Sequence, residues 1–131
     1  MALGYKDLLA RADAAVKSYE TADAPALIEN PDVVLVDIRD PRELDREGLI
    51  PSARHAPRGM LEFWIDPESP YHKPYFAQDK EFVFYCASGW RSLLAAQIAQ
   101  EMGLRSASLR GGIGDYKRAG HPIAERDRHP G

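Results

Sequence analysis

Two short stretches of the chain are apolar or aromatic at every position, Val33–Val36 and Phe82–Tyr85. Runs of this kind are typical of strands that are covered on both faces of a parallel sheet. Two weaker stretches, Arg54–Ala56 and Ser106–Leu109, predict further short strands. The strand pattern therefore favours a mostly parallel sheet.

Segments with helical spacing lie before, between and after these strands. Tyr5–Tyr19 has apolar residues three and four positions apart and predicts an amphipathic helix. Ser92–Met102 predicts another, with Leu94, Ile98 and Met102 as its apolar row, alanines between them and Gly103 at its end. Shorter helices are expected at residues 25–28 and 113–119.

The alternation of strands and helices predicts one α/β domain over residues 1–131, a three-layer sandwich with helices on both faces of the sheet. Within it, residues 1–20 are expected to form a helical extension and residues 126–131 a flexible tail. The stretch from Arg58 to Lys80 contains Pro67, Pro70 and Pro74 and predicts an irregular excursion. Its aromatic residues have two interpretations, a substrate lid or side chains that pin the loop to the core; they are Trp64, Tyr71, His72 and Tyr75.

Composition narrows the possible functions. With 17 Lys and Arg against 20 Asp and Glu, the net charge of −3 offers no general attraction for nucleic acid. No apolar run approaches the roughly 20 residues of a membrane span. The single cysteine excludes an internal disulfide and suits a reducing cytoplasm, and the four histidines are scattered, so neither a metal nor another cofactor is expected.

The candidate chemistry lies where the second strand ends, in Cys86-Ala87-Ser88-Gly89-Trp90-Arg91. A cysteine between a buried strand and a helix N-terminus is either an inert core residue or a nucleophile. The helix end stabilises a nearby anion by only about 0.3–1 kcal/mol at exposed sites, so loop amides and Arg91 would have to add to it. Two side chains have alternative roles: Ser88 bonds the sulfur or caps the helix, and Trp90 walls a pocket or contacts a partner.

Charged residues also follow the first strand. Asp37, Arg39 and Asp40 lie where Val33–Val36 would emerge from the sheet. In open α/β sheets the binding crevice lies at the carboxyl ends of the strands. A solvated turn that begins a short helix explains the same residues equally well.

The loop from Cys86 to Arg91 resembles the active-site loop of single-domain rhodaneses, sulfurtransferases that carry sulfur as a cysteine persulfide. Three further blocks are similar to that family and stand in the same order, so that the resemblance covers roughly residues 20 to 125; they are residues 35–40 with Glu43, 48–57, and 109–123. Leu49, Ser52 and Tyr116 depart from the common family residues without touching the sulfur site.

The resemblance implies a rhodanese-like fold and a thiosulfate sulfurtransferase with Cys86 as its nucleophile. Substrate-binding residues would be Ala87, Ser88, Gly89, Trp90 and Arg91, and Asp37 would brace the loop. Arg39 and Arg58 would add positive charge at the mouth of the site. The implied partners are a small sulfur donor such as thiosulfate and a thiol or cyanide-type acceptor, with a protein as a further possible acceptor.

Two other functions remain open. A rhodanese-like domain also serves as a non-catalytic interaction module or persulfide carrier, although such modules usually lose the cysteine. Fold relatives of rhodanese include cysteine-based phosphatases and arsenate reductases, whose loops are typically one residue longer. One residue adds roughly 3.3–3.6 Å of contour, so the shorter loop from Cys86 to Arg91 favours sulfur over a tetrahedral phosphate.

Overall fold

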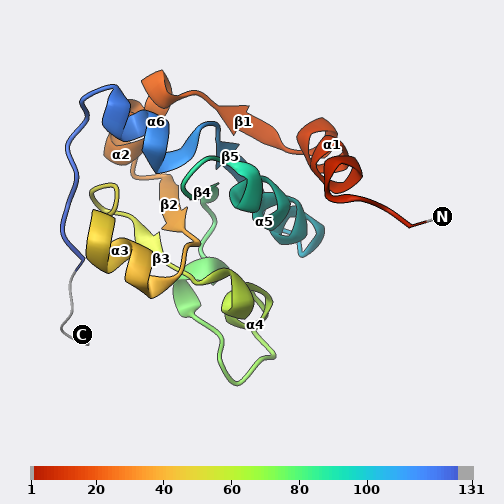
Figure 1. Ribbon diagram of the computed structural model, residues 1–131. Helices are drawn as coiled ribbons and strands as arrows, with labels where there is room; N and C mark the ends of the chain where they lie inside the picture. Colours follow the sequence, from red (N-terminus) through yellow and green to blue (C-terminus); the bar gives the residue numbers. More distant parts are fainter. Residues whose placement is uncertain (1, 127–131) are drawn as a thin grey trace.

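The computed structural model, which describes residues 2–126, is a single parallel sheet between layers of helices (Figure 1). The strand order is β1-β5-β4-β2-β3, and every neighbouring pair runs parallel. The strands are β1 Lys17–Tyr19, β2 Val33–Asp37, β3 Arg54–His55, β4 Glu81–Tyr85 and β5 Arg105–Leu109. The predicted α/β sandwich with a mostly parallel sheet is confirmed.

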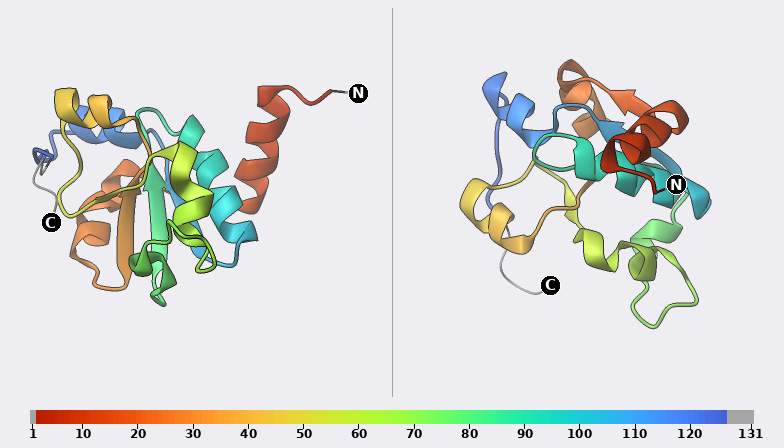
Figure 2. Two further views of the ribbon diagram at one scale, coloured as in Figure 1. Left: turned by 90° about the horizontal axis from the view of Figure 1, so that it is seen from below. Right: turned by 45° about the vertical axis from the view of Figure 1, so that its right-hand side comes forward.

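Side chains of the central strands alternate between two apolar layers, as a sheet covered on both faces requires. Phe82 and Phe84 of β4 pack with α4 (Leu61–Ile65) and α5 (Trp90–Glu101). Val83 and Tyr85 pack on the other face with α2 (Ala24–Glu29) and α6 (Gly112–Arg118). Figure 2 shows these two layers on either side of the strands, with α3 (Pro41–Glu47) on the α2 and α6 side.

The N-terminal helix is shorter than the sequence predicts. α1 covers Tyr5–Ala15 and packs on α5, where the Gln100 side chain donates a hydrogen bond of 3.0 Å to the Ala15 carbonyl. Lys17–Tyr19 form β1, which pairs with Ala107–Leu109 of β5. The prediction of a helix through Tyr19 is therefore wrong, because the open edge of β5 supplies hydrogen bonds that local helical spacing does not reveal.

The buried face of α5 also differs from the predicted row. Its fully buried residues are Ser92, Ala95, Ala96 and Ala99, whereas Met102 is exposed. Leu94 and Ile98 are only partly buried. The alanines face the sheet because small side chains let a helix approach it closely. Gly103 ends the helix at a positive φ of 97°, as its position predicts.

Much of the excursion from Arg58 to Lys80 packs into the hydrophobic core, so it does not have the structure of a free lid. It contains two 3-10 turns, η2 Arg58–Met60 and η3 Pro74–Ala77, with α4 between them. Leu61, Ile65 and Phe76 are buried in the same cluster as Phe82 and Phe84. The excursion therefore completes one helical layer of the sandwich, and the interpretation of pinning aromatics fits Trp64 and Tyr75, which pack against that cluster.

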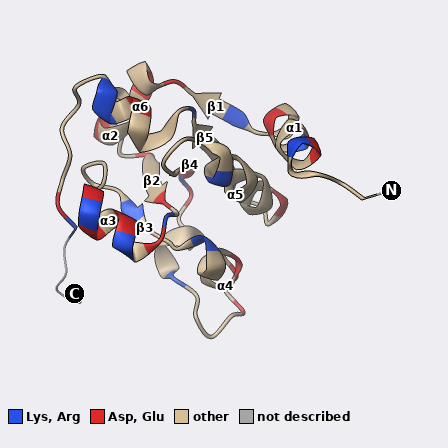
Figure 3. Cartoon of the chain, viewed as in Figure 1, with Lys and Arg blue, Asp and Glu red and all other residues tan. Residues whose placement is uncertain are grey.

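The C-terminal segment folds back along the connector after α3. Leu49 and Ala124 form an isolated antiparallel bridge, and Arg126 donates hydrogen bonds to the Pro41 carbonyl and Asp45. The prediction of a flexible tail is therefore wrong for Arg126, and its other residues, 127–131, lie outside the described residues. Among residues 2–126, no helix is long and apolar enough to cross a membrane. Figure 3 shows acidic and basic residues interspersed, most clearly on α3.

Candidate active site

Cys86 lies directly after β4, at the carboxyl edge of the sheet, and its side chain is buried. The loop that follows turns back over the sulfur, and the Gly89 amide donates a hydrogen bond of 3.2 Å to Sγ. This turn requires Gly89 to adopt φ 106°, a left-handed conformation that glycine enters without steric penalty. α5 begins at the next residue, so the sulfur lies at a helix N-terminus, where an anion is stabilised.

A hydroxyl network approaches the sulfur from inside the fold. The Cys86 thiol donates to Ser92 Oγ at 3.7 Å, and Ser92 Oγ donates to the Gly89 carbonyl at 3.2 Å. Ser108 Oγ of β5 lies 2.9 Å from Ser92 Oγ. Sequence reasoning missed Ser92, although its place in the first turn of the helix after a candidate cysteine was a usable signal. Ser88, the predicted contact, is exposed and bonds neither the sulfur nor the helix end within the described residues.

A second glycine-containing loop packs against the cysteine loop and donates hydrogen bonds to its carbonyls. Gly111 and Gly112 join β5 to α6 with φ of 77° and 58°. The Ile113 amide donates to the Cys86 carbonyl at 2.9 Å and the Gly114 amide donates to the Ala87 carbonyl at 3.0 Å. A Cβ on Gly112 would overlap the Cys86 carbonyl oxygen. The predicted turn at Gly111-Gly112 is present, and its close approach to the cysteine loop explains the pair of glycines.

Arg91 closes the loop, and Glu43 of α3 holds it. Two parallel hydrogen bonds of 3.0 Å run from the guanidinium to the Glu43 carboxylate. They hold the pKa of Glu43 below its usual value, although partial burial acts in the opposite direction. The same bonds raise the pKa of Arg91, with a smaller contribution from Cys86. Arg91 is therefore held by the carboxylate at the end of the cysteine loop.

Asp37 and Arg39 form a buried ion pair on the β2 side of the site. Arg39 Nη2 donates to Asp37 Oδ2 at 2.8 Å and to the Gly48 carbonyl at 2.7 Å. Burial lowers the pKa of Arg39, but its hydrogen bonds to Asp37 outweigh that effect and raise it. The prediction that Arg39 adds charge at the mouth is wrong, because the side chain is 0% exposed and neutralised inside the fold. Its bonds instead fix the end of α3, the helix that carries Glu43.

The remaining predicted residues surround the loop less closely. Trp90 is exposed and stacks on Tyr5 of α1, with ring centroids 5.5 Å apart. Ala87 is half-buried. Arg58 follows β3 and donates to Glu62 at 2.8 Å, so its charge is already paired. Behind the loop lies a cavity of about 160 Å³ whose lining includes Ser88, Gly89 and Arg110.

No metal centre accompanies the cysteine in the described part of the chain. Within residues 2–126, no three His, Cys, Asp or Glu side chains are grouped so that they could hold a metal ion. The chemistry available at Cys86 in that range comes from sulfur, backbone amides, hydroxyls and one guanidinium.

The fold and this loop together define a class of α/β proteins that carry a cysteine in a tight turn at the carboxyl edge of a parallel sheet. Comparison with known families places the chain within this class. Residues 20–119 match the rhodanese-like domain model, and the chain belongs to the rhodanese-like family.

Three relatives illustrate the likeness. A protein named sulfurtransferase from Allochromatium vinosum is 37% identical over 74% of this chain and 83% of its own. A thiosulfate:glutathione sulfurtransferase of Saccharomyces cerevisiae is 35% identical over 72% of each chain. A solved structure from Rhodopseudomonas palustris is 54% identical with a TM-score of 0.90, covering 94% of this chain and 96% of that one. That protein is of unknown function and is named as a possible tyrosine phosphatase.

Proposed function

We propose that this chain is a sulfurtransferase that takes sulfur from thiosulfate and passes it to a thiophilic acceptor through a persulfide on Cys86. The observation that carries the proposal is the surroundings of Cys86 Sγ, which combine the Gly89 amide, the Ser92 hydroxyl and a helix N-terminus. These groups stabilise an anionic sulfur, the form that attacks a sulfur donor. The sulfurtransferase names of relatives 35% and 37% identical support the same reaction class.

In the first half-reaction the Cys86 thiolate attacks the outer sulfur of thiosulfate. The new S–S bond forms as the sulfur–sulfur bond of thiosulfate breaks, and sulfite leaves with the electron pair. In the second half-reaction a thiolate or cyanide attacks the terminal sulfur of the persulfide. The bond to Cys86 then breaks, the thiolate is regenerated, and no external oxidant or reductant is needed.

Each neighbouring group has a role in this cycle. The Gly89 amide already donates to Sγ and would donate equally to a bound persulfide. When the thiol loses its proton, the Ser92 hydroxyl is placed to turn from the Gly89 carbonyl to the sulfur. Arg91 would bind the sulfonate end of the donor through two of its oxygens, as guanidinium groups bind phosphates. Because Cys86 is buried, the donor must displace part of the loop before it reaches the sulfur.

Intact-mass spectrometry after incubation with thiosulfate tests the proposal. The wild type should gain the mass of one sulfur atom, and cyanide should remove it with release of thiocyanate. Cys86→Ser should show no adduct, because it lacks the sulfur atom that would carry the persulfide. An unmodified wild type, or an equal adduct on Cys86→Ser, contradicts the mechanism.

A phosphatase is the second candidate, favoured by the name of the Rhodopseudomonas palustris structure. Only four residues separate Cys86 from Arg91, and the turn they form closes tightly enough for the Gly89 amide to reach Sγ. Assays with an aryl phosphate in place of thiosulfate compare the two activities directly. Cys86-dependent ester hydrolysis faster than sulfur transfer would favour the phosphatase.

The proposal leaves two routes for the sulfur. A small thiol such as glutathione is the acceptor named for the yeast relative, while a protein thiol would make this chain a persulfide carrier. Comparing the rate of persulfide loss to glutathione with its rate of loss to a reduced protein thiol at equal thiol concentration separates them. Both routes need Cys86 as a free thiol, which supports a reducing, cytoplasmic location.

A further inference from the structure

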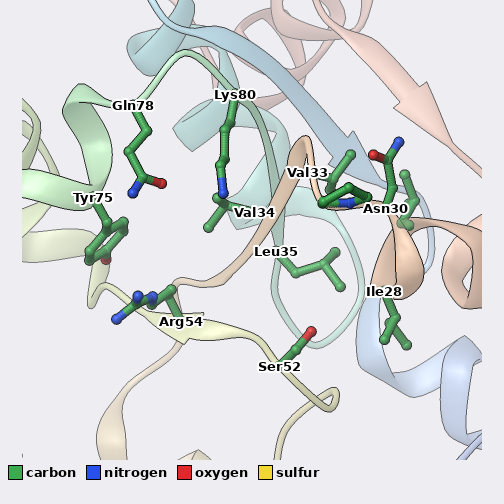
Figure 4. A pocket seen from close by; sticks show the side chains of 12 residues that line it. Ile28, Asn30, Val33, Val34, Leu35, Ser52, Arg54, Tyr75, Gln78 and Lys80 are labelled. Carbon is green, nitrogen blue, oxygen red and sulfur yellow. The ribbon is translucent and has the colours of Figure 1, made fainter.

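A second cavity, of about 300 Å³, lies at the other end of the sheet (Figure 4). Its lining includes Val33 at the start of β2 and Lys80 immediately before β4. Cys86 follows the carboxyl end of β4, so the cavity and the cysteine loop occupy opposite edges of the sheet. Whatever binds in this cavity does so away from the sulfur.

The charge of this cavity is opposite in sign to that of the whole protein. Arg54 and Lys80 line it, and the described lining residues include no Asp or Glu. The two acids beside Lys80 in sequence are engaged elsewhere: Asp79 pairs with Arg105 at 3.6 Å, and Glu81 accepts from Tyr19 at 2.6 Å. Although the net charge of the chain is −3, Arg54 and Lys80 both line this cavity without an acidic residue in its described lining.

Hydrogen-bond donors in the cavity lack partners. The side chains of Lys80 and Gln78 make no hydrogen bond or ion pair within residues 2–126. The Tyr75 hydroxyl is buried and likewise unpaired in that range. Burial raises the pKa of Tyr75 to about 12, so the hydroxyl keeps its proton at neutral pH. Arg54 and Gln78 are exposed and Lys80 is half-buried, so their donors are open to a ligand that enters the cavity, whereas the Tyr75 hydroxyl is closed off from it.

The rest of the cavity is apolar. Leu27, Ile28 and Leu35 contribute to its lining, and β3 pairs only with Val36 and Asp37, so the edge of residues 33–35 has no strand beside it there. Figure 4 shows Tyr75, Gln78, Lys80 and Arg54 around one end, with Ile28 toward the other. The Arg54 guanidinium stacks on the Tyr75 ring, 4.8 Å from its centroid, which holds both groups at the polar end.

We propose that this cavity binds a small organic oxyanion, a carboxylate or a phosphate monoester attached to an apolar body. The oxyanion accepts hydrogen bonds from Lys80 and Arg54, and the apolar body lies against Ile28 and Leu35. The volume is at the lower end of the roughly 300–1,000 Å³ found for small-molecule sites, which restricts the ligand to a few carbon atoms beyond the anionic group. The site is separate from the sulfur-transfer chemistry.

Titration of the full chain with hexanoate and hexyl phosphate, followed by backbone amide NMR shifts, tests the proposal. Saturable shifts are expected at residues 33–35 and at Lys80. The more tightly bound probe identifies the oxyanion, and hexanamide and hexylammonium should leave these amides unshifted. No saturable shift with either anion up to about 10 mM, ten times the roughly 1 mM Kd of a weak site, overturns the proposal. Equal shifts with hexanamide, or shifts confined to the Cys86 loop, overturn it too.

Substitutions distinguish binding in the cavity from a nonspecific attraction of anions to the charge of the protein. Lys80→Gln should weaken binding at least about tenfold, because a hydrogen bond to a charged group contributes that much or more. Tyr75→Phe should leave the affinity nearly unchanged, because the hydroxyl is closed off from the cavity and the ring under Arg54 is kept. Lys73→Gln removes the same charge from a lysine of the same excursion that stacks on Trp64 outside the cavity, and binding should be unchanged. Equal affinities in Lys80→Gln and the wild type contradict the site.

Discussion

Replacing Glu43 with glutamine should improve the use of thiosulfate. Glu43 accepts two hydrogen bonds of 3.0 Å from Arg91, the guanidinium that we propose for the sulfonate group of the donor. The carboxylate therefore competes with the substrate for the same donors and repels it by charge. Glu43→Gln removes the charge and one of the two acceptors, and leaves Arg91 available.

The magnitude follows from the exposure of the pair. Their side chains are 46% exposed for Arg91 and 21% for Glu43, so solvent screens the interaction strongly. An exposed pair contributes about 0.2–1 kcal/mol, and the bidentate geometry puts this one toward the upper figure. Releasing up to about 1 kcal/mol to the donor lowers KM for thiosulfate by about fivefold, with kcat nearly unchanged.

Steady-state kinetics of thiocyanate formation measures this effect. Arg91→Gln should raise KM, and the benefit of Glu43→Gln should disappear when both changes are combined. Asp79→Asn is the matched control, because it removes one acid that pairs with Arg105 at the opposite edge of the sheet. An unchanged or raised KM in a folded Glu43→Gln variant would refute the competition between Glu43 and the donor.

Three further predictions concern stability and the loop. Gly112→Ala should lower the free energy of unfolding by roughly 2–4 kcal/mol and abolish activity, because the new Cβ overlaps the Cys86 carbonyl. Urea titration measures this loss, and Gly59→Ala, which has open space around it, should lose little stability. Asp37→Asn should destabilise the fold by about 3–5 kcal/mol, because it leaves a buried Arg39 charge uncompensated, and a midpoint close to wild type would contradict this. The pKa of Glu43 is lowered on folding, so its contribution is complete above the usual value of 4.5 and is lost as the pH falls through the folded value. Urea midpoints between neutral and acidic pH should therefore fall less steeply in Glu43→Gln.

Local sequence patterns account for the parallel sheet and the cysteine loop. Val33–Val36 and Phe82–Tyr85 are apolar at every position because both faces of each strand are covered, and that signal needs no knowledge of neighbours. The strand–cysteine–helix order likewise specifies that Cys86 emerges at the carboxyl edge.

Features that depend on distant partners escaped the sequence. β1 exists because β5 offers an edge some 90 residues away, and local spacing at Lys17–Tyr19 favoured a helix instead. The Glu43–Arg91 pair joins residues 48 positions apart, so the sequence around either residue does not indicate its partner. Arg39 was predicted to be a surface charge because the sequence does not show that Asp37 and the Gly48 carbonyl bind its guanidinium inside the fold. Each case is a tertiary contact that overrides a local preference.

The small alanine side chains of α5 set how closely this helix packs on the sheet, and so they set where Arg91 and Ser92 lie relative to Cys86. Ala99 lies eight residues beyond Arg91, and at about 1.5 Å per residue this is roughly 12 Å along the helix. A helix moves as a stiff rod, so extra volume at Ala99 tilts its first turn, where Arg91 and Ser92 stand. Selection for a new sulfur donor can therefore act on core volume at α5, with every residue of the cysteine loop unchanged.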